Sequence, residues 1–528
     1  MKTVFRALAA TLAVVLLLGV FAGQGEAYGE SAAQTKQVKL PVLSIETVSR
    51  DAHVTDFVTK PVAPHVSEQI ASWTPGYVMP PAPYYEACTV SLRSGDGEIL
   101  LESCGAQVKV RGNWTTTYPK KPLRIKFDEK QSLLGLNGGA EQRNWLLLAE
   151  YKDASMLRNK AALYMSREIM GPHGLYAADA DFVQVELNGE YLGLYLLADM
   201  QQVSSRRVNI TEPEEGYAGV DIGYFLEYDG YFTDEDALHS FPLDFADNAK
   251  LRVYTGDPSS TRTERPLPKS RFDAKKPVGI TIKSTINSQE QHDFIESFVN
   301  NVYRIMYEAA YNNTAFVFDA DYGRIVETKA LTPRQAVEKV VDVQSLVDTY
   351  IISELTCDAD IYWSSFYMDA DFGPEGDRKL RFEAPWDFDS SMGNKDRCIN
   401  GRGFYAANLV PDVDGGRFGG GQYDTINPWL VVLVYEDWYQ ALIRETWTEA
   451  YDRGVFTRCC EMIETDSASL RDEFERNYAR WDNIRNRSQF EAELSAPAKR
   501  CTTEAEAAAF LLQWLNSRVE FLNGQWHT

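Results

Sequence analysis

Three aspartates of one stretch, Asp360, Asp387 and Asp389, stand in an order that suits phosphoryl transfer. In that reaction one carboxylate orients or deprotonates a hydroxyl, while another holds the metal ion on the phosphates. A solvated acidic loop is an alternative explanation for Asp360. The segment Ala384–Asp389, APWDFD, makes a poor surface turn, because a Pro-Trp pair followed by two acids around Phe388 favours a rigid platform for a metal ion.

The elements that must position these acids are predicted from hydrophobic periodicity. Apolar residues at 3- and 4-residue spacing predict a helix over Val341–Leu355, which ends shortly before Asp360. Two alternating apolar runs, from Phe366 onward and up to Ala384, surround a polar turn at Asp369–Asp377. They predict a hairpin that leads directly into the two later aspartates.

A second group of candidates consists of cations in a strongly negative chain. The loop and strand RGNWTTTYPKKPLRIKF contain Arg111, Lys120, Lys121, Arg124 and Lys126. Some of these cations could bind phosphate, or they could be strand-edge lysines that discourage aggregation. We favour phosphate binding for Arg124 and Lys126, which alternate opposite an apolar face. For Lys120 both explanations stay open.

Three further charged residues attract attention because of their surroundings. A helix is predicted to open at Ala154 or Ser155, and Asp153 at its N-terminal end has a sufficient local cause, since an acid there stabilises a helix by roughly 0.3 to 1 kcal/mol. Arg158 in the same first turns has no such cause. Glu227 lies in an otherwise apolar strand, and an acid flanked this way is expected to be ion-paired, with Lys126 or Lys283 as the candidates.

The N-terminal residues 1–27 have the pattern of a cleavable secretory signal. Two cations precede an apolar run, Ala7–Ala22, which is shorter than the ~20 residues of a membrane span. No later stretch is apolar enough to cross a bilayer. We therefore expect an exported, soluble protein that is secreted or held at the cell surface.

Composition and charge narrow the class of protein further. Of the 528 residues, 44% are hydrophobic and 12% aromatic, so the chain can bury a large core. The formal net charge of −23 opposes an encounter with a nucleic-acid backbone or an anionic membrane. It is compatible with a cationic protein substrate. The oligomeric state is left open.

Cysteine and histidine spacing predicts no zinc site, because the seven cysteines and six histidines form no paired Cys-x-x-Cys or ligand cluster. Cys88 and Cys104 lie symmetrically about the turn Gly95–Gly97, and a hairpin with a three-residue loop would bring their sulfurs face to face. Cys357 and Cys398 bracket the central hairpin and could staple it.

The order of the predicted elements indicates an α+β fold with a strand-rich N-terminal half and a helical C-terminal half. Strands dominate from Tyr84, with the strongest hairpin signal at Asn188-Gly189. Later helices are predicted over Gln289–Ala310, Trp429–Arg453, Ser467–Asn486 and Thr503–Asn523. The predicted organisation is a signal peptide (1–27), an extended lead-in (28–76), a main domain (77–400) and a helical part of that same domain (401–528).

Four ordered blocks of the chain resemble the spore coat protein H (CotH) family of atypical protein kinases. They are Val110–Phe127 (VRGNW…YPKKPLRIKF), Trp145–Asn159 (WLLLAEYKDASMLRN), Val185–Ile210 (VELNGEYLGLYLL…RVNI) and Asp360–Asn394 (DIYWSSFYM…PWDFDSSMGN). The resemblance implies a kinase-like fold in 77–400. It also implies the use of ATP with Mg²⁺ or Mn²⁺ to phosphorylate Ser or Thr of a protein substrate.

The resemblance also implies roles for individual residues. Asp360 takes the catalytic position, Asp387 the metal-binding position, and Asp389 is a possible second ligand. Ser365 occupies the slot where kinases place an Asn for a second metal ion. The cofactor-binding candidates are Arg124 and Lys126 for the phosphates, then Arg111 and Arg158, with Lys121, Glu227 and Lys283. Asp199 and Met200 stand where the family has Glu and Gln.

Two other functions remain as alternatives. A non-catalytic pseudokinase module for cell-surface or coat assembly is favoured by export, where ATP is scarce, and by Ser365. A glycan-processing enzyme would use two facing carboxylates and stacking tryptophans such as Trp363 and Trp386. That function leaves the cations between Arg111 and Lys126 unexplained.

Overall fold

The computed structural model describes residues 37–50, 68, 71, 75–76, 85–112, 114–244, 251–256, 264–265, 278–358, 360–362, 364–395, 399–408 and 426–528. The predicted signal peptide, Trp363 and Cys398 lie outside these residues. The predicted pairing of Cys357 with Cys398 therefore concerns a residue that is not described. Among the described residues, no helix has both the length and the apolar character that crossing a membrane requires.

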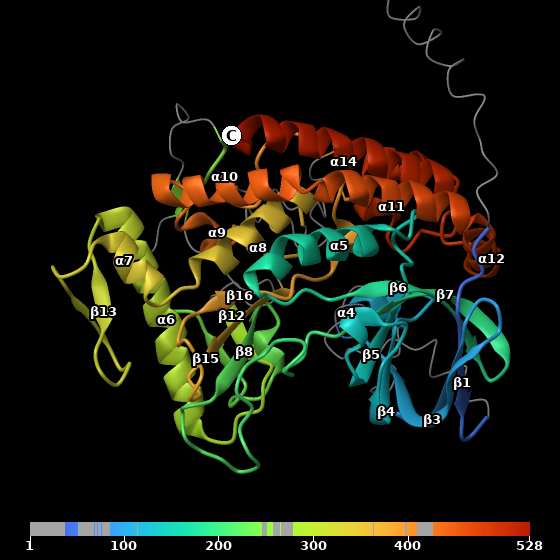
Figure 1. Cartoon of the computed structure of the whole chain (residues 1–528), viewed down its shortest axis with the longest axis horizontal. Helices are drawn as coiled ribbons and strands as arrows, with labels where there is room; N and C mark the ends of the chain where they lie inside the picture. Colours follow the sequence, from blue (N-terminus) through green and yellow to red (C-terminus); the bar gives the residue numbers. More distant parts are fainter. Residues whose placement is uncertain are drawn as a thin grey trace, which may run out of the picture.

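Seven strands of the N-terminal half close into a barrel, at the right of Figure 1. Neighbouring strands are antiparallel except β1 and β6, whose parallel pairing closes the barrel. Around the barrel the strands are β1 (Val42–Thr47), β2 (Glu86–Arg93), β3 (Ile99–Val110), β4 (Leu123–Gln131), β5 (Gln142–Leu148), β7 (Glu190–Ala198) and β6 (Ala180–Leu187). β1 lies in the segment predicted as an extended lead-in, so the fold begins before residue 77.

Alternation of side chains explains why these segments form a barrel. Leu123, Ile125 and Phe127 of β4 are fully buried and point inward with Trp145 of β5, while the polar residues between them point outward. The β6–β7 hairpin turns on Asn188-Gly189 as predicted, and both turn residues have positive φ, as a two-residue hairpin turn requires.

The predicted β2–β3 hairpin also forms, but its cysteines are not joined. An irregularity in the pairing after Val90 shifts the register, so Cys104 lies opposite Val90 and Cys88 lies opposite Ala106. Both cysteines are free thiols. The prediction that the two sulfurs face each other was wrong, because it assumed a hairpin without a bulge.

A second, open sheet has the strand order β16-β15-β8-β12-β9. The central strand β8 (Gly223–Asp229) is buried along its whole length and pairs with β15 (Phe366–Asp371) and β12 (Gly279–Ile282). β15 pairs with β16 (Arg381–Phe382), which confirms the hairpin predicted before the acidic segment. The edge strand is β9 (Ser240–Pro242).

Helices form a layer that covers both sheets in Figure 1. Two of them, α5 (Arg158–Met170) and α8 (Val343–Thr356), pack against each other and lead into the acidic region. The others of this layer are α9 (Pro428–Val431), α10 (Asp437–Asp452), α11 (Val455–Ser469), α12 (Arg471–Trp481), α13 (Ala496–Arg500) and α14 (Glu504–Trp526). One hydrophobic core joins this layer to the open sheet.

A smaller group of elements lies at the left of Figure 1, beside the open sheet. It consists of α6 (Gln289–Asn312), β13 (Phe316–Phe318), β14 (Ile325–Glu327) and α7 (Pro333–Glu338). β10 (Leu251–Arg252) pairs with β11 (Glu264–Arg265), and a short turn, α4 (Leu136–Gly139), follows β4. The 3-10 turns are η1 (Trp114–Thr117), η2 (Gly171–His173), η3 (Phe232–Asp234), η4 (Phe388–Ser390) and η5 (Glu491–Glu493).

Two of the predicted helices differ from the observed ones. The helix expected over Trp429–Arg453 is interrupted between α9 and α10, where the intervening residues form turns with their apolar side chains buried. The helix expected over Ser467–Asn486 divides at Leu470 into the end of α11 and the whole of α12. In both places tertiary burial of apolar side chains overrides helical periodicity.

A buried ion pair fixes the end of α8, the helix that leads to Asp360. Arg518 of α14 and Glu354 of α8 are both fully buried, and their Nη2 and Oε1 atoms are 2.6 Å apart. The Glu354 carboxylate also accepts hydrogen bonds from the backbone N–H groups of Tyr405 and Ala406, at 2.5 and 2.8 Å. The pair therefore joins α8, α14 and the segment around residue 405.

Arg518→Met should destabilise the protein strongly, because it leaves the Glu354 carboxylate buried without its cation. Breaking such a pair costs about 3 to 5 kcal/mol of unfolding free energy. Denaturant unfolding of the variant measures this loss. Arg485→Met is the control, since Arg485 and its partner Asp482 are 82% and 54% exposed. A loss for Arg518→Met as small as that of the control would contradict the assigned role.

Candidate active site

The three predicted acids meet in the structure. Asp360 lies in the turn after α8, Asp387 directly precedes η4, and Asp389 is within η4. One carboxylate oxygen from each lies within 4.8 Å of those of the other two. The turn that carries Asp360 is fixed locally, because the Asp360 N–H donates to the Asp358 carboxylate at 3.0 Å.

The first turn of α5 holds the acidic segment in place. Asn159 Oδ1 accepts a hydrogen bond from the Phe388 N–H at 2.8 Å, between the two metal-ligand candidates. Arg158 donates to the carbonyl oxygens of Ser391 and Met392 on the far side of η4. These contacts explain why an Arg-Asn pair opens the helix, a position for which no local cause was apparent in the sequence.

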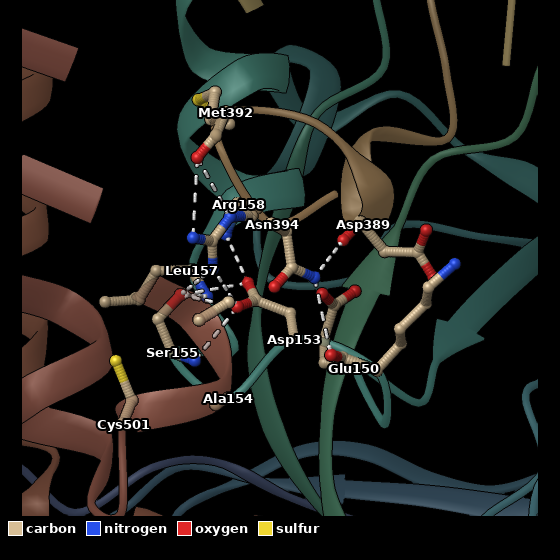
Figure 2. Close-up of polar contacts among 12 residues, drawn as sticks. Glu150, Asp153, Ala154, Ser155, Leu157, Arg158, Asp389, Met392, Asn394 and Cys501 are labelled. Carbon is tan, nitrogen blue, oxygen red and sulfur yellow. Dashed lines mark hydrogen bonds and ion pairs between the residues drawn. The ribbon is translucent and has the colours of Figure 1, made fainter. Parts of the chain in front are cut away.

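Figure 2 shows how Arg158 is itself held. Its guanidinium forms a buried ion pair with Asp153, whose carboxylate also accepts from the Arg158 N–H at 2.9 Å. Asn394 donates to the carbonyl oxygen of Asp389 at 2.6 Å and to that of Lys152 at 3.4 Å. Arg158, predicted as a phosphate contact, is thus engaged with Asp153 and backbone carbonyls.

The backbone of the acidic segment adopts unusual conformations. Asp387 has φ 70°, Ala384 has φ 61° and Met392 has φ 46°, all in the left-handed region. Residues other than glycine adopt this region at an energetic cost, and such conformations cluster at functional sites. The surrounding hydrogen bonds from α5 offset that cost.

Burial and repulsion by neighbouring carboxylates raise the pKa of two members of the acid cluster, Asp387 and Asp389. Burial, followed by the charges of Asp389 and Asp360, raises the pKa of Asp387 to about 8. Burial likewise raises the pKa of Asp389, while the positive charge of Lys152 opposes the shift. Three oxygen ligands in one place suit a hard divalent cation such as Mg²⁺ or Mn²⁺. A bound cation would relieve the repulsion, so the residues fit the metal that the sequence implied.

Three cations gather on the outer face of the barrel next to this cluster. Lys109 lies directly opposite Arg124 across β3 and β4, and Arg111 follows Lys109 on the same face. Burial lowers the pKa of Lys109, and so do the charges of Arg124 and Arg111. Like charges placed opposite each other destabilise a sheet. A bound anion would remove that repulsion.

Arg111 connects the cationic face to the acids. It is half-buried, and its guanidinium lies 6.0 Å from the ring centroid of Trp386. Burial lowers the pKa of Arg111, and attraction to Asp387 is the largest opposing effect. Within the part of the chain that the structure describes, Arg111 has no carboxylate at ion-pair distance.

The remaining predicted cations differ in their surroundings. Arg124 donates to Asn144 Oδ1 at 2.8 and 3.1 Å, and Lys126 is exposed opposite Gln107 and Asn144. Lys121 is buried, donates to the carbonyl of Thr116 at 2.5 Å, and has its pKa lowered to about 8 by that burial.

Lys120 is fully buried and therefore serves the barrel rather than a strand edge. Its ammonium donates to the carbonyls of Ala149 and Leu194, and burial lowers its pKa to about 7. Neither the phosphate-binding nor the strand-edge explanation describes this position. The lysine instead joins the loop before β4 to the residue after β5 and to the middle of β7.

Glu227 is ion-paired as expected. Its carboxylate lies 3.0 Å from Lys283 Nζ, which confirms one of the two predicted partners. The same carboxylate accepts from the Ser365 N–H at 2.9 Å, so Ser365 is held through its backbone in a left-handed conformation with φ 59°. Asp199 is buried and ion-paired with Arg207, with the hydroxyl of Tyr176 donating to it at 3.0 Å.

Sequence reasoning missed several residues beside the acids. Lys109 carries no signal beyond its alternation with Arg111. Lys152 donates to Ser390 Oγ at 2.7 Å and is ion-paired with Glu493 at 2.7 Å. Only long-range contacts reveal that pair, because the two residues lie far apart in the sequence. Ser390 directly follows Asp389, and its residue type alone gives no signal of a role.

A second buried carboxyl pair lies in the hairpin that leads to the acids. Asp369 and Glu383 are 1% and 5% exposed, and neither Asp369 oxygen receives a hydrogen bond from a described group. Burial is the largest cause that raises both pKa values, well above the ordinary range for Asp369 and to about 7 for Glu383. The two carboxyls therefore share a proton near neutral pH.

The chain is similar to known proteins over most of its length. Residues 108–497 match the sequence profile of a family described as CotH kinase protein. The inner spore coat protein H of Bacillus subtilis (strain 168) is 27% identical over 157 residues. The matched stretch covers 30% of this chain and 37% of that relative, so it spans well under two thirds of the relative's length.

Glu383→Gln should stabilise the protein at alkaline pH. Because the pKa of Glu383 is raised in the folded state, the folded protein keeps a proton that the unfolded chain loses. The contribution of this pair to stability therefore falls as the pH rises from the ordinary Glu range through about 7. A Gln amide donates to Asp369 at every pH.

The expected gain at about pH 8 is about 1 to 3 kcal/mol of unfolding free energy, and little gain is expected at about pH 5. Urea unfolding of variant and wild type at both pH values measures it. Glu375→Gln, in the exposed turn of the same hairpin, is the matched control. An equal effect of Glu383→Gln at the two pH values would show that no proton is shared.

Proposed function

This chain belongs to the CotH kinase protein family, and we propose that it is an exported protein kinase that transfers the γ-phosphate of ATP to Ser or Thr of a protein. The observation that carries the proposal is the meeting of Asp360, Asp387 and Asp389 within 4.8 Å. All three lie inside the matched range 108–497. The cationic face of the barrel beside them supports the same proposal.

The proposed roles follow from the position of each acid. Asp387 and Asp389 would hold Mg²⁺ or Mn²⁺, which neutralises phosphate charge when bound. Asp360 lies at the end of α8, is partly exposed, and would orient the substrate hydroxyl and accept its proton. Its position on a turn fixed by Asp358 keeps the carboxylate near the other two acids.

The phosphates of ATP would bind to the cationic face of the barrel. The charges of Arg124 and Arg111 lower the pKa of Lys109, and the charge of Arg124 lowers the pKa of Arg111. Positive charges placed this close together suit the binding of a polyanion. Lys126 extends the same face as an exposed cation. In this proposal a strand-rich part that would bind phosphate lies against an acid-bearing part, which is the arrangement that a kinase requires.

Other predicted cofactor contacts are assigned to positioning. Arg158 holds the segment after Asp389, and Lys121 is bound to the carbonyl of Thr116. Glu227 joins Lys283 to the Ser365 backbone, so this ion pair supports the position of Ser365. These four residues would affect nucleotide binding through the groups that they hold.

The structure favours a kinase over a glycan-processing enzyme. Trp386 is 4% exposed and faces Arg111, so its ring is not available to stack on a sugar. The non-catalytic alternative is favoured by one specific residue. Ser365 has no amide oxygen for a second metal ion, and a site with fewer ligands could bind without turnover.

Thermal stability of the protein with Mn²⁺ and ATP tests the proposal. Ligand at about 100 times its dissociation constant adds about 2.7 kcal/mol to the unfolding free energy. We expect this stabilisation in the wild type and its loss in Asp387→Asn. Asp96→Asn, in the exposed turn between β2 and β3, should behave like the wild type.

Phosphate transfer from labelled ATP to the protein itself or to a generic basic protein separates binding from catalysis. Asp360→Asn should keep the stabilisation by ATP and lose transfer by at least about a hundredfold, because a general base contributes typically 10²- to 10⁴-fold. Stabilisation without transfer in the wild type would support the non-catalytic module. The absence of both stabilisation and transfer would refute nucleotide binding.

A further inference from the structure

We propose that Lys152 acts as a resident cation of the acid cluster, positions Asp389 through Ser390, and lets the cluster work with a single divalent ion. The inference rests on the proposed function, because it concerns the metal site of that reaction. Lys152 lies between β5 and α5, and its side chain is 6% exposed. Nothing in the local sequence around it requires a buried lysine.

A chain of short contacts leads from Lys152 to the acids. Lys152 Nζ donates to Ser390 Oγ at 2.7 Å, and Ser390 Oγ in turn donates to Asp389 Oδ1 at 3.1 Å. The hydroxyl has one proton, and the ammonium contact leaves that proton free to point at Asp389. The lysine therefore determines which Asp389 oxygen accepts a hydrogen bond and which faces the other acids.

The charges around Lys152 do not cancel without the cluster. Glu493 lies 2.7 Å from Lys152 Nζ and 3.7 Å from Lys395 Nζ, so one carboxylate is shared by two ammonium groups. Among the residues that the structure describes, these two ammonium groups have only this carboxylate at ion-pair distance, and burial makes an uncompensated positive charge costly. The carboxylates next to it are those of the acid cluster.

The number of metal ions follows from this balance. Three carboxylates opposed by the positive charges of Lys152 and Arg111 carry a net charge of about minus one, which a single divalent ion is sufficient to neutralise. In kinases a second ion is held by an Asn, and here that slot is Ser365, whose N–H is bound to Glu227. Lys152 thus supplies the positive charge that a second metal ion supplies in other kinases.

The test is a titration of Mn²⁺, followed by electron paramagnetic resonance of the free ion, with and without a non-hydrolysable ATP analogue. We expect one tight ion per wild-type chain. Ser390→Ala keeps the lysine charge and loses the relay, so it should bind one ion about 10- to 100-fold more weakly, the usual effect of removing a group that orients a metal ligand. Lys152→Met should bind weakly and take up a second ion.

Two further variants complete the design. Lys152→Arg keeps the charge and should restore binding of a single ion. Lys160→Met is the matched control, since Lys160 is a mostly buried lysine of α5 paired with Asp181 and Asp466 away from the acids. It should leave Mn²⁺ binding unchanged. If Lys152→Met does not fold, Ser390→Ala and Lys152→Arg still test whether the lysine and its hydroxyl relay support the binding of one metal ion.

Wild-type uptake of two ions of similar affinity would overturn the inference, as would a Ser390→Ala variant that binds Mn²⁺ like the wild type. These outcomes are distinct from failure of the proposed function. Mn²⁺ binding with the expected variant pattern but no phosphate transfer would refute the kinase and leave the role of Lys152 standing. Phosphate transfer by the wild type, together with unchanged Mn²⁺ binding in the variants, would support the kinase and refute the role of Lys152.

Discussion

The constraint on which the site depends is the repulsion among three partly buried carboxylates that the fold brings within 4.8 Å of one another. Left to themselves these groups would separate or take up protons, as the raised pKa of Asp387 shows. They stay together because the first turn of α5 binds the backbone on both sides of η4. The unfavourable backbone conformation of Asp387 is maintained by the same contacts.

Two positively charged side chains approach the acids from different sides. Arg111 approaches from the barrel, and Lys152 approaches from the segment between β5 and α5. Among the described residues, no carboxylate outside the cluster fully balances the positive charge of Arg111 or of Lys152. Both positive charges therefore act on the acid cluster. The barrel would therefore contribute more than the proposed phosphate-binding face, because the positive charge of Arg111 also offsets part of the repulsion that the acidic segment creates.

Local pattern was sufficient to predict the acids, the hairpin before them and the helix that delivers Asp360, since each depends on residues close together in the sequence. It was also sufficient for the pairing of Glu227 with Lys283, because an acid in an apolar strand needs a partner. It could not predict the pairing of β1 with β6, the displacement of Cys104 from Cys88, or the contact of Lys152 with Glu493. Those features depend on barrel closure, a bulge and the packing of the C-terminal segment, none of which leaves a periodic signal.

The C-terminal part is consequently part of the site rather than a separate support. Glu493 reaches Lys152 beside the acids, and Arg518 fixes the end of the helix that carries the chain to Asp360. Both contacts join residues more than a hundred positions apart, so they form only when the whole domain is folded. Because the acids repel one another without a cation, the free energy of binding the proposed metal ion would add directly to the stability of that folded state. The order of the C-terminal segment and the affinity of the proposed metal site would then depend on each other.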